Sequence, residues 1–267
     1  MKNIVEKWFD ILELPSEWKQ DVLSYCDKTD IAEIESHDDP YLWLFEQEDK
    51  LLSLVYVIYK CESFADYSHS KGIGDDVIIP TLSELKRYAL ECYKLTGKIG
   101  LIHSKWLGKI LNGKIYRLGR LEFEMRDAMH SYEPMGLTKG ENVIGVHIPD
   151  NGGPFTPEVC DEAYEKAKSF FAKHFPEFQY KHYVCNSWLL DRTLKKFLKS
   201  ESNIVKFMDS FEEVATKEVY SAFTYLFGMG TEAKDLKNFT PTTSLQKGII
   251  EHIENGGKLY STFGVKK

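Results

Sequence analysis

The chain has 267 residues, 43% of them hydrophobic and 28% charged. This length is enough to form a buried core in one large domain or in two modest domains. Its formal net charge of −7 excludes a strong overall positive field, so we expect no nucleic acid and no membrane as a partner. No stretch approaches the roughly 20 apolar residues of a membrane span, and the charged N-terminus is unlike a signal peptide. We therefore expect a cytoplasmic protein.

The cysteines and histidines are scattered along the chain. No CxxC pair occurs, and no two histidines have the spacing of metal ligands. This pattern favours reduced thiols over a disulfide framework, and it predicts no metal site. The five cysteines are Cys26, Cys61, Cys92, Cys160 and Cys185.

Residues 1–113 have the pattern of a helical domain. Apolar residues recur at helical spacing in residues 17–28, 42–64 and 101–113. In residues 81–97, Thr81 followed by Glu84 predicts a capping box, and Gly97 predicts the end of that helix. We expect this part to form an N-terminal domain of its own.

The pattern changes at Lys114, where "KIYRLGRLEFEM" alternates between apolar and polar residues and predicts one strand. Further strands are expected at 142–149, 180–190, 219–227 and 258–265. Helices are expected between them at 156–174, 191–199 and 243–257. This order predicts a second domain, 114–267, of α/β or α+β class, with a mixed sheet covered by helices on both faces.

The stretch "GVHIPDNGGPFTPEV", residues 145–159, joins a strand to a helix through a glycine pair, with Thr156 expected as the helix N-cap. Backbone N–H groups in such a turn can bind a pyrophosphate, helped by the helix dipole. Asp150 and Glu158 place negative charge there, so an ordinary tight turn is the alternative. The possible donors are Asn151, Gly152, Gly153 and Phe155.

In "YVCNSWLLD", alternation places Cys185 and Ser187 on one face of a strand. These side chains could activate a thiol or orient a substrate carbonyl, or they could simply fill a buried strand face. Trp188 is expected to be a core anchor beside them.

Three further side chains could bind or react. Arg120 and Glu122 share a strand face, where the arginine could hold an anionic group and the carboxylate could act as acid or base. A structural ion pair is the alternative. His147 lies near the end of its strand, where it could be a general base or a structurally satisfied side chain.

Six strings in the second half of the chain resemble one bacterial family in the same order. They are "GKIYRLGRLEFEM", "GVHIP", "PEVCDEAYEKAKSFFAKHFP", "CNSWLLD", "SNIVKF" and "TSLQKGIIEHIENGGKLYSTFG". The family consists of acyltransferase domain-containing proteins with a helical N-terminal domain and a GNAT-like C-terminal domain. The resemblance is strong over residues 72–264 and rests on helical character alone before them.

The resemblance implies transfer of an acyl group from acetyl-CoA or another acyl-CoA to an amine. In GNAT enzymes the pyrophosphate lies on the amides between the fourth strand and the next helix. Here that is the turn before the helix at 156–174, with Asn151–Thr156 binding CoA and Val146 and Ile148 lining its arm. The strand at 180–190 would diverge to admit the pantetheine.

The same resemblance suggests roles for the candidate side chains. His147 or Glu122 would remove the proton of the amine, and Ser187 or Cys185 would protonate the leaving thiolate. The substrate would lie beside Arg120 and Trp188. The acceptor is expected to be a small molecule, and a homodimer is possible.

Two features of the sequence support other functions. "DNGGPF" lacks the Arg/Gln-x-x-Gly-x-Gly/Ala pattern of GNAT turns, and "DRTLKKFLK" lacks the tyrosine that often serves as general acid. A protein that binds acyl-CoA or another metabolite without catalysis is therefore the first alternative. The second is a thiol enzyme with Cys185 as nucleophile and His147 as base.

Overall fold

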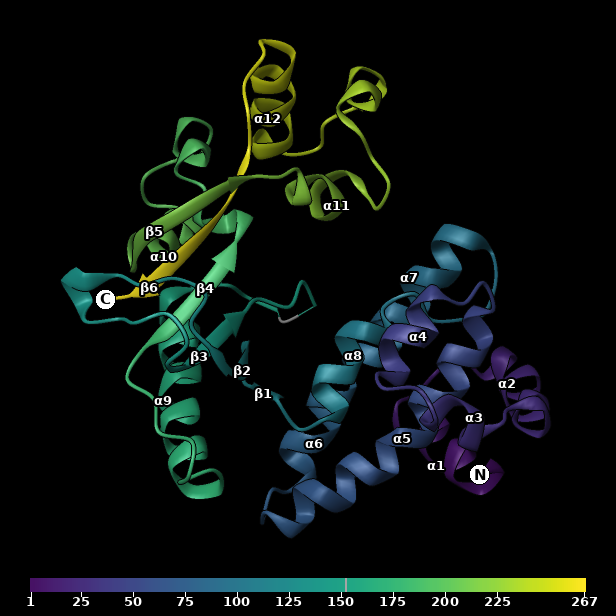
Figure 1. Cartoon of the computed structure of the whole chain (residues 1–267). Coiled ribbons are helices and arrows are strands. Elements are labelled where there is room, and N and C mark those ends of the chain that lie inside the picture. The colour runs from purple at the N-terminus through teal and green to yellow at the C-terminus, as the bar shows by residue number, and fades with distance from the viewer. Residues whose placement is uncertain (152) are drawn as a thin grey trace. The chain divides into compact units, whose positions relative to one another are not determined.

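The computed structural model describes residues 1–151 and 153–267, and it divides into two compact units, Met1–Arg117 and Leu118–Lys267. The first unit is built from helices alone apart from the start of β1 (Figure 1). Its helices are α1 (Lys2–Ile11), α2 (Lys19–Tyr25), α3 (Ile31–Glu35), α4 (Pro40–Glu46), α5 (Lys50–Ser70), α6 (Asp75–Leu82), α7 (Glu84–Thr96) and α8 (Ser104–Leu111).

The core of this unit forms around α5, its longest helix. Asp49 caps α5, because its carboxylate accepts hydrogen bonds from the backbone N–H groups of Leu51 and Leu52. Helices α1, α2, α4 and α8 all pack against α5, and its middle section is buried. No helix among residues 1–151 and 153–267 is long and apolar enough to cross a membrane.

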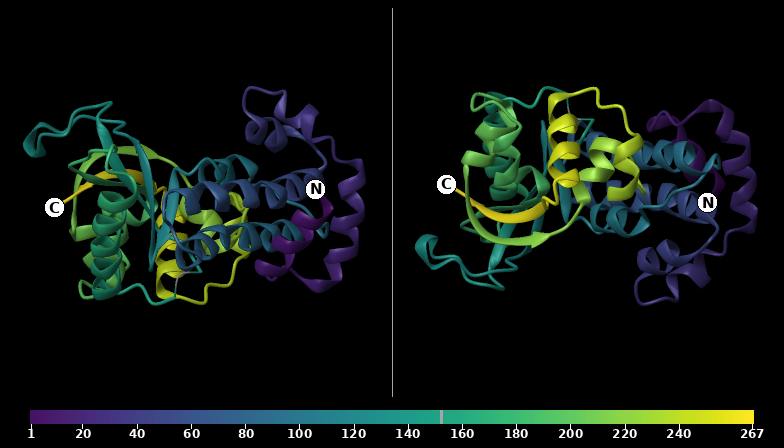
Figure 2. Two further views of the ribbon diagram at one scale, coloured as in Figure 1. Left: turned by 90° about the horizontal axis from the view of Figure 1, so that it is seen from below. Right: turned by 90° about the horizontal axis from the view of Figure 1, so that it is seen from above.

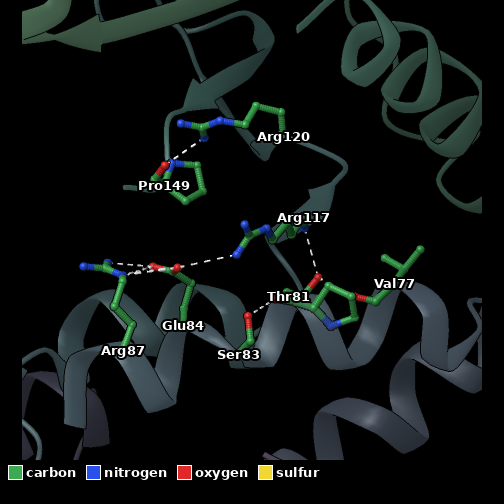
Figure 3. A network of polar contacts seen from close by, with 9 residues as sticks. Val77, Thr81, Ser83, Glu84, Arg87, Arg117, Arg120 and Pro149 are labelled. Carbon is green, nitrogen blue, oxygen red and sulfur yellow. Dashed lines mark hydrogen bonds and ion pairs between the residues drawn. The ribbon is translucent and has the colours of Figure 1, made fainter. Parts of the chain in front are cut away.

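The predicted capping box at Thr81 and Glu84 is wrong. Thr81 lies within α6, where its Oγ1 donates to the Val77 carbonyl at 2.7 Å and accepts from the Arg117 N–H at 2.9 Å (Figure 3). The hydroxyl bonds a carbonyl one turn back, as a threonine inside a helix does. Helix α6 therefore continues through Thr81 to Leu82, and Ser83 separates it from α7. Glu84 is buried and bound by Arg87, with Oε2 and Nη2 2.6 Å apart.

The second unit carries a mixed sheet, which confirms the predicted fold class. Its order is β1-β2-β3-β4-β6-β5, with β3 and β4 parallel and the pairs β2–β3, β4–β6 and β5–β6 antiparallel. The strands are β1 (Ile115–Leu118), β2 (Leu121–Asp127), β3 (Asn142–His147), β4 (Tyr183–Ser187), β5 (Phe211–Glu218) and β6 (Tyr260–Lys266). The helices are α9 (Pro157–His174), α10 (Asn203–Asp209), α11 (Ser221–Phe227) and α12 (Ser244–Glu254).

Two strand predictions need correction. Residues 114–125 form a hairpin, β1 and β2, because Gly119 adopts a φ of +75° and reverses the chain. Residues 219–227 were expected to be a strand but hold helix α11, while the strand is β5 just before it. Phe223 and Phe227 lie one helical turn apart and contact each other, so the aromatic residues of this segment pair along a helix.

Helix α9 lies along one face of the sheet (Figure 1). Its Tyr164 ring contacts Phe123 of β2 and Tyr183 of β4, at 5.7 and 5.2 Å between ring centroids. The views in Figure 2 also show β5 and β6 side by side over most of their length, as their register requires. The residues after β2 cover part of the opposite face, in a cluster formed by Ala128, Leu137, Val143, Val184, Phe263 and Val265.

The double role of Thr81 leads to a stability prediction. Thr81→Val keeps the shape of the side chain but leaves the Arg117 N–H without the Thr81 oxygen. Loss of such a buried hydrogen bond typically costs about 1–3 kcal/mol. We expect a lower melting temperature and faster amide exchange at Arg117, measured by calorimetry and hydrogen exchange.

Thr231→Val is the control. Thr231 Oγ1 also donates to a carbonyl four residues back, but within the described residues it accepts no backbone hydrogen bond from another element. Equal stability loss in the two variants would contradict a special role for the Thr81–Arg117 contact.

Candidate functional site

Strands β3 and β4 pair only over a short section, through the middle of β3 and the start of β4. Their register joins Ile144 to Tyr183 and Gly145 to Val184, and no described pair follows. Beyond this point β3 continues beside β2, whereas Cys185 to Ser187 of β4 pair with β6. We call the region where the two parallel strands stop pairing the β3–β4 fork.

The backbone of β3 presents polar groups toward this fork. The Ile144 N–H donates to the His182 carbonyl at 3.0 Å, so Ile144 turns its backbone groups toward β4. Because the direction of the backbone N–H and C=O groups alternates along a strand, those of Val146 and Ile148 point to the same side as those of Ile144, toward β4. The two predicted arm-lining residues therefore lie where the pairing with β4 is ending.

The turn that follows β3 leads directly into α9. Gly153 has a φ of +76° and open space around it, and Gly152 lies outside the described residues. Thr156 is the N-cap of α9, as predicted, with its Oγ1 3.5 Å from the Val159 N–H. The Glu158 side chain also bonds its own N–H, and this bond is the main reason that its pKa is lowered. Part of the donor capacity of the helix start is thus already used internally.

Arg120 holds this turn in place. Its Nη1 donates to the Pro149 carbonyl at 2.7 Å (Figure 3), and its guanidinium carbon lies 5.1 Å from the centre of the Phe155 ring. The side chain is 9% exposed, so most of it is enclosed by the unit. The hairpin turn after β1 therefore fixes the two ends of the β3–α9 connection. Contact of Arg120 with a substrate stays a prediction.

A cluster of ionisable side chains lies on one face of β2 and β3. Glu122 pairs directly with His147 in the register, and both Glu122 and Glu124 are at least 96% buried. His147 Nε2 lies 2.9 Å from Glu124 Oε2, and Arg126 Nη1 lies 3.6 Å from the same oxygen. A carboxylate that holds an imidazole in this way fixes the orientation of the ring.

Gly145 makes room for this cluster. A Cβ at Gly145 would lie 2.8 Å from Cδ of Arg126 and 3.5 Å from Cβ of Glu124. Because Gly145 has no side chain, the Arg126 side chain can lie over β3 at this point and reach the Glu124 carboxylate.

Cys185 and Ser187 lie on the opposite face of the sheet. Val184 pairs with Gly145 and shares its face, so the neighbouring Cys185 points to the other side, toward α9. Burial raises the pKa of Cys185 to about 12. The structure thus separates Cys185 from His147 and keeps the thiol protonated, which contradicts the thiol-enzyme alternative.

Ser187 and Trp188 have local structural partners. Ser187 Oγ accepts from the Leu189 N–H at 3.1 Å and caps the short 3-10 helix Trp188–Leu190. Trp188 is partly exposed and stacks on Tyr225 of α11, with ring centroids 6.1 Å apart. The prediction that Trp188 anchors the core is wrong, because the residue faces another aromatic side chain at the surface.

Comparisons with known proteins agree with this architecture. Residues 115–266 match the model of the GNAT-like C-terminal domain, and residues 3–113 match that of the N-acyltransferase N-terminal domain. The chain belongs to the GNAT-like C-terminal domain family. No curated protein matches it.

Solved structures of acyltransferases share the fold of this GNAT-like protein. One, in complex with decanoyl-CoA and teicoplanin, has a TM-score of 0.76 and 21% identity, covering 97% of this chain and 86% of the other. A variant in complex with octanoyl-CoA has a TM-score of 0.76 and 22% identity, with the same coverage. At this identity the likeness establishes the fold.

Sequence reasoning missed two residues of the cluster around His147, Glu124 and Arg126. The alternation in "LEFEM" placed Glu122 and Glu124 on one face but could not tell which one reaches His147. That choice depends on the register, which places Glu122 opposite His147 and Glu124 diagonal to it, and on the side-chain conformations that bring Glu124 to the imidazole; a single sequence specifies neither.

The position of Cys185 leads to a prediction about its reactivity. With a pKa of about 12, only about one thiol in ten thousand is ionised at pH 8. We expect iodoacetamide to leave Cys185 unmodified in the native protein between pH 7 and 9, and to alkylate it once denaturant is added. Peptide mapping by mass spectrometry measures this, and rapid native labelling or an acyl-Cys185 adduct would refute it.

Proposed function

We propose that this protein is an N-acyltransferase that moves an acyl group from acyl-CoA to the amine of a small acceptor. The observation that carries the proposal is the position of the His147–Glu124 pair on β3 and β2, directly beside the β3–β4 fork. An imidazole held by a carboxylate suits a general base, and the fork offers backbone partners for an extended arm. Membership in the GNAT-like family supports the same reaction class.

In this proposal the acyl-CoA arm lies along the edge of β3, with its amides on the backbone of Val146 and Ile148. The pyrophosphate lies at the turn, near the backbone of Asn151, Gly153 and Phe155. The open space around Gly153 is consistent with a bulky ligand there. Because no lysine or arginine occurs in residues 150–156, binding would depend mainly on backbone dipoles.

The chemical step follows from the placement of the base. The amine nitrogen attacks the thioester carbon, and His147 takes the proton that the nitrogen loses. The C–S bond then breaks, the acyl group stays on nitrogen as an amide, and the thiolate of CoA leaves. The thiolate takes up a proton from water, and His147 returns the proton of the amine to water. Glu124 orients the imidazole and balances its charge, while close positioning of the two reactants supplies much of the rate.

Similar proteins suggest the size of the substrates. Their complexes contain octanoyl-CoA, decanoyl-CoA and the glycopeptide teicoplanin. We propose a medium-chain acyl-CoA as donor and an amine-bearing small molecule as acceptor for this chain.

The incomplete match of the turn to the GNAT pattern favours a second candidate, a protein that binds acyl-CoA without turnover. Binding of acyl-CoA with no CoA release across a panel of amines would favour this candidate over the enzyme.

The turn can be tested with two variants of Gly153 that carry the same backbone strain and differ in charge. Gly153→Asp and Gly153→Asn have the same shape, and Asn tolerates a positive φ well. Ligand binding to the native state raises the melting temperature by mass action. We expect decanoyl-CoA to raise it in wild type and Gly153→Asn, and much less in Gly153→Asp.

Thermal-shift assays at fixed ionic strength measure the effect, with ligand-free melting temperatures as the reference. An equal rise in the Asp and Asn variants would argue against phosphate binding at this turn.

The base can be tested by removing the imidazole. We expect His147→Gln to lower kcat by about 10²–10⁴-fold, the usual contribution of general-base catalysis, with little change in acyl-CoA affinity. CoA release detected with a thiol reagent measures the rate. His182→Gln is the matched control, since His182 also faces a carboxylate, Glu141, at 3.8 Å, but lies before the paired part of β4.

Unchanged turnover in His147→Gln would exclude the histidine as base.

We also expect Glu124→Gln to lower kcat by less than His147→Gln, and the double variant to be no slower than His147→Gln alone, because the two residues act as one unit.

A further inference from the structure

Tyr164 is a partly buried residue of α9 to which no function has been assigned above. Its ring lies between Phe123 of β2 and Tyr183 of β4, on the face of the sheet that α9 covers. Cys185, the first β4 residue beyond the paired part, is close enough to contribute to its electrostatic environment. Tyr164 therefore lies over the beginning of the β3–β4 fork.

The hydroxyl of Tyr164 is covered and has no hydrogen-bond partner within the described part of the chain. Buried polar atoms in native proteins are nearly always paired, so an unpaired one calls for an explanation. Two of the groups beside its ring do not serve as acceptors. The Tyr183 hydroxyl is 2.9 Å from that of Tyr180, and the Lys266 ammonium lies over the Tyr164 ring, 5.2 Å from its centre.

Tyr164 also lines a small cavity of about 40 Å³ between α9 and α10. The cavity begins at Phe155 and Thr156, where the β3–α9 turn enters the helix, and Asn203 and Lys206 of α10 form another part of its wall. The Tyr164 side chain thus contacts both this cavity near the start of α9 and the strands at the β3–β4 fork.

We propose that the Tyr164 hydroxyl donates a hydrogen bond to a carbonyl oxygen of the pantetheine arm of acyl-CoA. This inference rests on the proposed function, since it needs an acyl-CoA at the fork. The arm carries amide carbonyls, which are the acceptors that the hydroxyl lacks, and β3 can pair with it from the other side. Desolvation by burial raises the pKa of Tyr164 well above 10, so the hydroxyl keeps its proton and acts as a donor.

The test compares ligands with and without the arm. Calorimetry would measure the affinities of wild type and Tyr164→Phe for decanoyl-CoA, CoA and 3′,5′-ADP, which lacks the arm. We expect Tyr164→Phe to bind decanoyl-CoA and CoA about three- to tenfold more weakly, as for a lost neutral hydrogen bond, and 3′,5′-ADP equally well. Because the hydroxyl has no protein partner, the ligand-free variant should melt at the wild-type temperature or above it.

Tyr183→Phe is the matched control. It removes a hydroxyl from a ring in contact with Tyr164, but this hydroxyl already pairs with Tyr180. We expect it to bind all three ligands as wild type does.

Two results would overturn the inference alone: a Tyr164→Phe variant with wild-type affinity for decanoyl-CoA, or one with an equal loss for 3′,5′-ADP. A wild-type protein that binds none of the three ligands would overturn the proposed function and the inference with it.

Discussion

The divergence of two parallel strands is the constraint on which the rest of the site depends. Strand β3 is held by β2 through six register pairs, and β4 is held by β6 through four, so each follows a different neighbour after their short common section. The polar backbone groups on the inner edges must then find other partners, because an unpaired buried backbone group is costly. A ligand with amides along an extended chain can satisfy these groups as a third strand would.

The same constraint explains how functional groups come together from distant parts of the chain. Pairing with β2 brings Glu124 within 2.9 Å of His147, although 23 residues separate them. The hairpin turn before β2 carries Arg120, which fixes the connection from β3 to α9 through the Pro149 carbonyl. One antiparallel pair therefore aligns the proposed base and also holds the proposed phosphate turn.

The sequence predicted those features that depend on neighbours along the chain. The α9 helix and its Thr156 cap, and the alternation that separates Cys185 from Asn186, follow from local rules and are present in the structure. Contacts across strands could not be predicted from one sequence. "EFE" offers two equivalent carboxylates, and although the register places Glu122 opposite His147, it is the diagonal neighbour Glu124 that the imidazole contacts. The β1–β2 hairpin was missed because the sequence does not reveal that Gly119 has a positive φ. Thr81 was assigned wrongly because a threonine hydroxyl can either cap the start of a helix or bond a carbonyl one turn back within a helix.

Two opposed faces of the sheet divide the chemistry of the unit. The face with Glu122, Glu124 and His147 carries ionisable groups, whereas the face under α9 carries aromatic rings and thiols whose pKa is raised by burial. An acyl-CoA that passes through the fork would meet neutral donors and apolar side chains on the helix side and a charged base on the other. Such a division suits the proposed reaction, because the base that takes the proton of the amine lies on one side of the fork, and the acyl chain would meet apolar side chains on the other. Because the chain is acidic overall, binding of an anionic cofactor requires a positive local potential at the turn. The backbone dipoles of the α9 start and the neighbouring Arg120 guanidinium are its sources there.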